Sequence, residues 1–109
     1  MKKTSKFKIQ GTISFRDCPD SAEPKSAKLT NCPKWLKRYK FFTHRHLDGG
    51  ERNFNLTEMR TGLAIVLGLK SRKSAIKSGI SKMANVGRIK FQSAHKKGLK
   101  WKQQIINKL

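Results

Sequence analysis

Four side chains in the first half of the chain are of the types that bind zinc: Cys18, Cys32, His44 and His46. Thiolates and imidazoles are the usual ligands of structural zinc. His44 and His46 would share one face of a strand, because alternate side chains point the same way. The spacing, however, contains no pair of cysteines or histidines at zinc-finger distance. We therefore predict no bound metal and interpret both cysteines as thiols of a cytoplasmic protein.

The stretch from His46 to Asn53 reads His-Leu-Asp-Gly-Gly-Glu-Arg-Asn. It resembles the His-hydrophobic-Asp-Gly-x-x-x-Asn core of HNH homing endonucleases. The resemblance implies a metal-dependent nuclease in which His46 is the general base and Asp48 and Asn53 shape the site. Arg45 stands where the family would have a metal ligand, and no third histidine follows at the family's spacing. The alternative, which we favour, is a polar turn at residues 48–50.

The chain is strongly basic. Of its 109 residues, 26 are lysine or arginine and 6 are aspartate or glutamate, which gives a formal net charge of +20. Residues 59–109 hold 13 of the basic residues and no acidic residue. Nucleic acid is the commonest partner with enough negative charge for such a surface. The basic residues are too dispersed for a single membrane-surface helix, and no apolar run is long enough to span a bilayer. We therefore predict a nucleic-acid partner and no membrane association.

The positive field is expected to be strongest over the second half of the chain. The predicted nucleic-acid-binding side chains are the basic and hydroxyl groups there. They are Lys70, Arg72, Lys73, Ser74, Lys77, Ser78, Lys82, Arg88, Lys90, Lys96, Lys97, Lys100 and Lys102.

Two helices are predicted to position these side chains. The first, over residues 56–67, has Asn55 as N-cap and Glu58 three residues later, as in a capping box. It is apolar on nearly every side, which is typical of a buried helix. The second begins at Ser71 and ends at Gly87 or two residues earlier. It carries apolar residues on one side and basic and hydroxyl residues on the other.

Residues 88–92 and 99–103 each alternate between apolar and polar side chains, which predicts a β-hairpin. Helix, turn, basic helix and hairpin, over residues 55–103, resemble the order of elements in winged helix-turn-helix proteins. The resemblance implies that the second helix enters the major groove of DNA while the hairpin contacts the backbone. The alternative is a small α+β core with a solvated lysine face.

The first half is predicted to contribute one strand over residues 7–16, where apolar and polar side chains alternate. Residues 1–6 are expected to form a flexible basic arm and residues 17–30 an exposed loop. Residues 31–46 fit a helix that starts at Pro33, but also a strand rich in aromatic residues. Both readings stay open. The aromatic residues there suit either the core or stacking on unpaired bases.

Together these patterns predict an α+β protein with one domain, residues 7–109, built on two central helices, a C-terminal hairpin and an N-terminal strand. The predicted function is binding of double-stranded DNA by a small non-catalytic protein without cofactors, such as a regulator of a phage or mobile element. The HNH-like nuclease is one alternative. Others are an RNA-binding or ribosome-associated structural protein and a protein that docks on an acidic protein surface.

Overall fold

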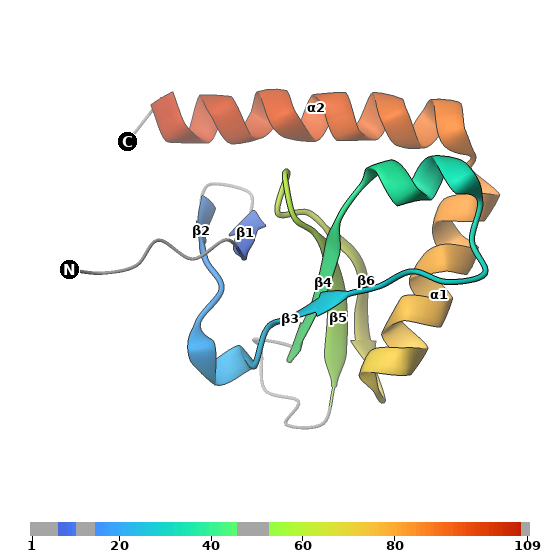
Figure 1. Ribbon diagram of the computed structural model, residues 1–109. Coiled ribbons are helices and arrows are strands. Elements are labelled where there is room, and N and C mark those ends of the chain that lie inside the picture. The colour runs from blue at the N-terminus through green and yellow to red at the C-terminus, as the bar shows by residue number, and fades with distance from the viewer. Residues whose placement is uncertain (1–6, 11–14, 46–52, 108–109) are drawn as a thin grey trace.

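The computed structural model describes residues 7–10, 15–45 and 53–107. Strands come first in the chain and the two α-helices last (Figure 1). A two-stranded sheet contains β1 (Lys8–Gln10) and β2 (Phe15–Asp17). A four-stranded antiparallel sheet has the order β3-β4-β5-β6, with strands β3 (Lys25–Ala27), β4 (Phe41–Arg45), β5 (Phe54–Glu58) and β6 (Ala64–Leu69). The helices are α1 (Arg72–Val86), α2 (Arg88–Asn107) and the short 3-10 helices η1 (Asp20–Ala22) and η2 (Lys34–Arg38).

The two α-helices cover different parts of the sheets. α1 packs against β4, β5 and β6, whereas α2 contacts α1 and β2. Figure 1 shows α2 passing across one end of the large sheet and over the β1–β2 pair. Neither helix, within the described part of the chain, combines the length and the hydrophobicity that crossing a bilayer requires.

Neighbouring phenylalanines on β4 point to opposite faces of the large sheet, as successive strand residues do. Phe41 lies in a core cluster with Leu36 and Leu56, which includes side chains of α1. Phe42 joins Cys18 in a second cluster, and the ring centroid of Phe7 is 4.9 Å from that of Phe42. The large sheet is therefore covered on both faces, by α1 on one and by the N-terminal segment on the other.

The predicted buried helix over residues 56–67 is wrong, because this segment forms the hairpin of β5 and β6. The side chain of Asn55 accepts a hydrogen bond from the backbone N–H of Gly68 on the opposite strand, at 2.9 Å. The carboxylate of Glu58 accepts from the N–H groups of Arg60 and Thr61 in the turn, at 2.9 and 2.8 Å. The residues that looked like a helix cap therefore close a hairpin. Short apolar runs fit a buried strand as well as a helix, so only pairing with β4 separates the two.

β6 lies at the edge of the large sheet and is shielded against further strand pairing. Its register with β5 shifts twice, and Leu67 is 59% exposed. Bulges of this kind bend an edge strand away from potential partners. The ammonium group of Lys82 on α1 donates to the carbonyl oxygen of Ile65 at 2.9 Å, which occupies one edge carbonyl.

The predicted C-terminal hairpin over residues 88–103 is also wrong, because the segment is helical throughout. Phe91, His95, Gly98 and Ile105 are buried at the spacing of one helix face. The predicted alternation would place Ile89 and Phe91 on one face, but Ile89 is 77% exposed and Phe91 is buried. With the strands first and the helices last, the winged helix-turn-helix order over residues 55–103 does not fit, and the fold is not two central helices with a C-terminal hairpin.

Other local predictions agree better with the structure. The helix predicted from Ser71 is confirmed as α1, whose N-cap Ser71 accepts from the N–H of Ser74 and which ends at Gly87 with a φ of 87°. The ambiguous residues 31–46 contain both structures, η2 followed by β4. The single strand predicted over residues 7–16 is instead the antiparallel pair β1 and β2, in which Lys8 lies opposite Asp17.

Candidate nucleic-acid interface

Most of the HNH-like stretch lies outside the described residues, including His46 and Asp48. Asn53 is half-buried and directly precedes β5. The nearby His44 is buried on β4, where its Nε2 lies 2.9 Å from the hydroxyl of Thr57 and its Nδ1 lies 2.9 Å from the carbonyl oxygen of Arg45. His44 is therefore committed to contacts inside the sheet.

The candidate zinc ligands are separated by the fold. Cys18 is buried in the cluster around Phe42, while Cys32 packs against the cluster around Leu36 on the other face of the sheet. Both cysteines are free thiols. Over the described ranges, no three side chains of the histidine, cysteine, aspartate and glutamate types come close enough to hold a metal ion.

Arg72, predicted to contact nucleic acid, instead joins α1 to the rest of the fold. Its guanidinium donates to the carbonyl and hydroxyl oxygens of Thr43 on β4 and to the carbonyl oxygen of Glu23, at 3.1, 2.9 and 2.7 Å. It also lies 4.7 Å from the ring centroid of Phe54, within the range of a cation–π contact. Burial lowers the pKa of Arg72, which stays charged at neutral pH.

Two further lysines of the predicted set also contact backbone carbonyls. Lys82 reaches Ile65 at the edge of β6, and Lys102 donates to the carbonyl oxygen of Arg60 at 2.8 Å. Each of these ammonium groups holds a helix against the β5–β6 hairpin. Their positive charge still contributes to the surface field, but their reach toward a partner is restricted.

A groove of about 530 Å³ lies between α1 and the segment that follows β3; we call it the α1 groove. Lys73 and Lys77 line it from the helix, and Lys28 lines it from the segment after β3. Ile76 and Ile80 supply apolar surface between these charges. The structure thus brings two of the predicted binding residues together with a lysine that was not predicted.

A second groove, of about 710 Å³, lies beside η2; we call it the η2 groove. Lys28 lines this groove too, together with Lys37 and Lys40. Tyr39, which is half-buried, contributes aromatic surface, and the fully buried Leu36 lies beneath it. Lys28, Thr30 and Asn31 border both grooves, so the segment at residues 28–31 forms a ridge between them. Among the residues that the structure describes, no acidic side chain lines either groove.

The backbone of Asn31 on this ridge has a φ of 52°. Asparagine tolerates this left-handed conformation better than most residues, although not at zero cost. The side chain of Asn31 is exposed and offers both a hydrogen-bond donor and an acceptor.

The predicted binding residues on α2 form a separate basic surface. Arg88, Lys90, Lys96, Lys97 and Lys100 are exposed, and none of them lines either groove. Lys70, just before α1, is exposed as well, while Ser74 and Ser78 are half-buried. The charge of the second half is therefore divided between the α1 groove and α2.

Sequence reasoning missed Lys28, Lys37 and Lys40, because the first half also contains all the acidic residues. In the structure two of those acids are engaged elsewhere, Asp17 with Lys8 and Glu23 with Arg45. The hydrogen bond from Arg45 lowers the pKa of the Glu23 carboxyl, and the charge of Arg45 adds to this effect. Neither of these two acids lines a groove. The alternation of lysines with apolar residues over residues 34–41 was the available signal.

A buried pair, Glu58 and His95, also went unpredicted. His95 Nε2 on α2 lies 3.0 Å from Glu58 Oε1 at the end of β5. The two residues are 37 positions apart and come together only because α2 crosses the hairpin turn. This pair does not border either groove.

No protein-family model, curated protein or solved structure matches this chain.

Proposed function

We propose that this protein binds nucleic acid by its phosphates along the α1 and η2 grooves. One observation carries the proposal: five lysines line two adjoining grooves, and no acidic side chain of the described residues lines them. They come from three places in the fold, namely the ridge, the segment around η2, and α1. The net charge of +20 attracts a polyanion from a distance. As part of this proposal we place the protein in the cytoplasm, in keeping with its free thiols.

The residues that line the grooves favour an unpaired strand over a duplex. The expectation of double-stranded DNA depended on a recognition helix followed by a hairpin. The segment predicted to form that hairpin is instead the helix α2. Single strands bind in basic grooves that follow the phosphate backbone while bases rest on apolar or aromatic side chains. Ile76 and Ile80 in one groove and Tyr39 in the other supply such surface next to lysines. A single strand of DNA or RNA is therefore the proposed ligand.

The test compares two variants of equal charge. The groove variant replaces Lys28, Lys73 and Lys77 with alanine, and the control variant replaces Lys90, Lys96 and Lys97 on α2. Binding to a fluorescent single-stranded oligonucleotide and to a duplex of the same sequence is measured at one salt concentration. We expect the groove variant to lose at least tenfold more affinity for the single strand than the control variant does.

Two results would refute parts of this proposal. Equal losses in both variants would show that binding depends on total charge and not on the grooves. Tighter binding of the duplex than of the single strand by the parent protein would restore the double-stranded reading.

A further inference from the structure

The outer side of α2 is a basic surface that neither groove includes. α2 contains six lysine or arginine residues and no acidic residue. Five of its exposed side chains form what we call the α2 surface, and none of them lines either groove: Lys90, Lys96, Lys97, Lys100 and Trp101. Trp101 is 44% exposed and follows Lys97 by about one helical turn, so these two side chains are neighbours. The α2 surface thus combines ammonium groups with an aromatic ring.

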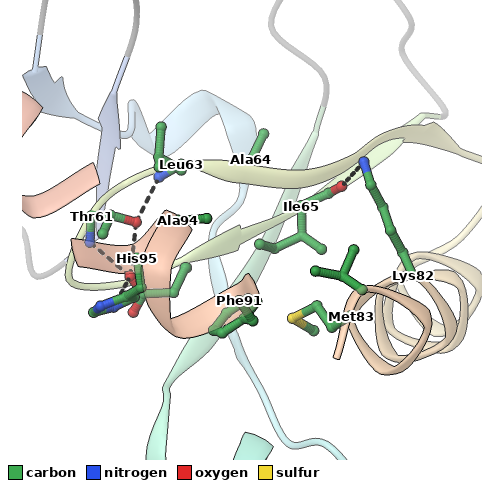
Figure 2. Close-up of a pocket in the computed structure, with 11 residues that line it drawn as sticks. Thr61, Leu63, Ala64, Ile65, Lys82, Met83, Phe91, Ala94 and His95 are labelled. Carbon is green, nitrogen blue, oxygen red and sulfur yellow. Dashed lines mark hydrogen bonds and ion pairs between the residues drawn. The ribbon is translucent and has the colours of Figure 1, made fainter. Parts of the chain in front are cut away.

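The α2 surface faces away from the rest of the fold. Figure 2 shows Phe91 and His95 of α2 pointing toward the side chains of the β5–β6 hairpin. The ring centroid of Tyr39, which lines the η2 groove, is 4.8 Å from the centroids of both residues. At about 3.6 residues per turn, Lys97 and Lys100 lie on the opposite side of the helix. The helix itself, roughly 10 Å thick with its side chains, therefore separates the α2 surface from the η2 groove.

The charges of α2 are arranged unfavourably for the free protein. Arg88 and Lys90 lie in the first turn, where the helix dipole disfavours positive charge. Lys96 and Lys100 are four positions apart, a spacing at which like charges repel each other. α2 has no acidic side chain to offset these effects. A polyanion bound along the outer side of the helix would relieve both of them.

We propose that the α2 surface binds a second single strand of nucleic acid, so that one protein molecule holds two strands. The inference rests on the proposed function of the grooves, which hold the first strand. The lysines of the α2 surface contact phosphates, and the indole of Trp101 offers a face on which a base stacks. Ser93 and Gln104 are exposed on the same side of α2 and interrupt the apolar stripe that a membrane-surface helix needs.

The experiment mixes the protein with two non-complementary single strands, one carrying a donor dye and the other an acceptor dye. Strands of about 6 nucleotides suit one binding site each. Energy transfer between the dyes reports that both strands are captured, and sedimentation gives the mass of the complex. We expect energy transfer from a complex of one protein molecule and two strands. Saturation at one strand per protein, or energy transfer only from complexes of two protein molecules, would overturn the proposal.

Two variants of equal charge locate the second strand. The first replaces Lys90, Lys96 and Lys97 with alanine. It should bind the first strand like the parent, while its affinity for the second strand falls by about tenfold or more because phosphate contacts are lost. The second replaces three exposed lysines that line neither groove and lie outside α2, and it should keep both strands: Lys25, Lys34 and Lys70. Equal loss of the second strand in the two variants would refute a site on α2.

Trp101→Ala tests the surface without changing its charge. Loss of one stacked base should weaken the second strand by about fivefold or more and leave the first strand unaffected. Unchanged affinity for the second strand would refute the role of Trp101. Strand-saturated protein that binds phosphatidylserine vesicles and no second strand would assign the α2 surface to a membrane instead.

Failure of this inference is distinct from failure of the proposed function. A first strand that binds equally well when the groove lysines are replaced would refute the grooves. A first strand that depends on the grooves, without a second strand, would refute only the α2 site. The stoichiometry of the parent protein decides even if a variant fails to fold.

Discussion

Arg72, in the first turn of α1, donates two hydrogen bonds to Thr43 on β4, one to the hydroxyl oxygen at 2.9 Å and one to the carbonyl oxygen at 3.1 Å. Thr43 is buried, so its oxygens would lack these donors if the guanidinium were removed. Neighbouring Lys73 is exposed and borders the α1 groove. Arg72 therefore contributes to stability, whereas its neighbour Lys73 is available for the proposed binding.

Arg72→Ala should lower the free energy of unfolding by about 2–3 kcal/mol, because hydrogen bonds from a charged donor to buried acceptors are lost. Lys73→Ala, on the same helix, should change stability by less than about 0.5 kcal/mol, as exposed substitutions usually do. Urea denaturation measures both. If Arg72→Ala left stability unchanged and weakened oligonucleotide binding instead, Arg72 would belong to the interface after all.

Gly62→Ala should destabilise the protein much more than Gly68→Ala. Both glycines have positive φ, 73° and 71°, so alanine strains the backbone by roughly 1–2 kcal/mol at either position. At Gly62 an added Cβ would also lie 2.8 Å from the backbone nitrogen of Gln10, whereas nothing lies within 4 Å at Gly68. This clash should add about 1–3 kcal/mol at Gly62. Equal unfolding free energies in the two variants would show that β1 does not dock on the hairpin turn.

The contribution of Glu23 to stability should disappear in acid. Its pKa is lowered below the ordinary value of 4.5, first by the hydrogen bond from Arg45. A carboxyl with a lowered pKa stabilises the folded state above its unfolded-state pKa and loses that effect as pH falls through its folded-state pKa. The parent should therefore be more stable than Glu23→Gln at neutral pH, with the difference shrinking below about pH 4.5. The difference is measured by thermal unfolding at a series of pH values. A difference that stays constant into acid would contradict the ion pair with Arg45.

Affinity for a single strand should fall steeply with salt, because each lysine–phosphate contact releases counterions. Five groove lysines predict a slope of log K against log salt of roughly −3.5 for a single strand. The groove variant, with three of these lysines removed, should have a slope shallower by about 2. Titrations between 50 and 200 mM salt measure both slopes. A parent slope near zero would exclude phosphate contacts as the main source of affinity.

The N-cap of α1 depends only on residues that are close together in the sequence. Ser71 and Ser74 lie three positions apart, and the cap between them needs no other part of the chain. The start of this helix and its basic outer side could therefore be predicted correctly. The charge of the chain is likewise a sum over residues and does not depend on the fold.

The hairpin of β5 and β6 and the helix α2 required the tertiary structure. The carboxylate of Glu58 accepts backbone N–H groups both in the predicted helix cap and in the observed turn, so the residue type does not choose between them. Pairing with β4 and packing under α1 favour the strands. At the start of α2, the apolar side chains of Ile89 and Phe91 alternate with polar ones, as in a strand. Phe91 and His95 nevertheless share a helix face, and this face is buried against Tyr39.

The candidate sites also depend on contacts between distant parts of the chain. Lys28 and Lys73 are 45 positions apart, and they line one groove only because α1 packs on the sheet beside the segment that follows β3. Glu58 and His95 likewise meet only where α2 crosses the β5–β6 turn. The sequence by itself therefore determined the charge and the start of α1. The tertiary structure alone decided which lysines share a groove and that His95 lies against Glu58, because both depend on packing between residues far apart in the chain.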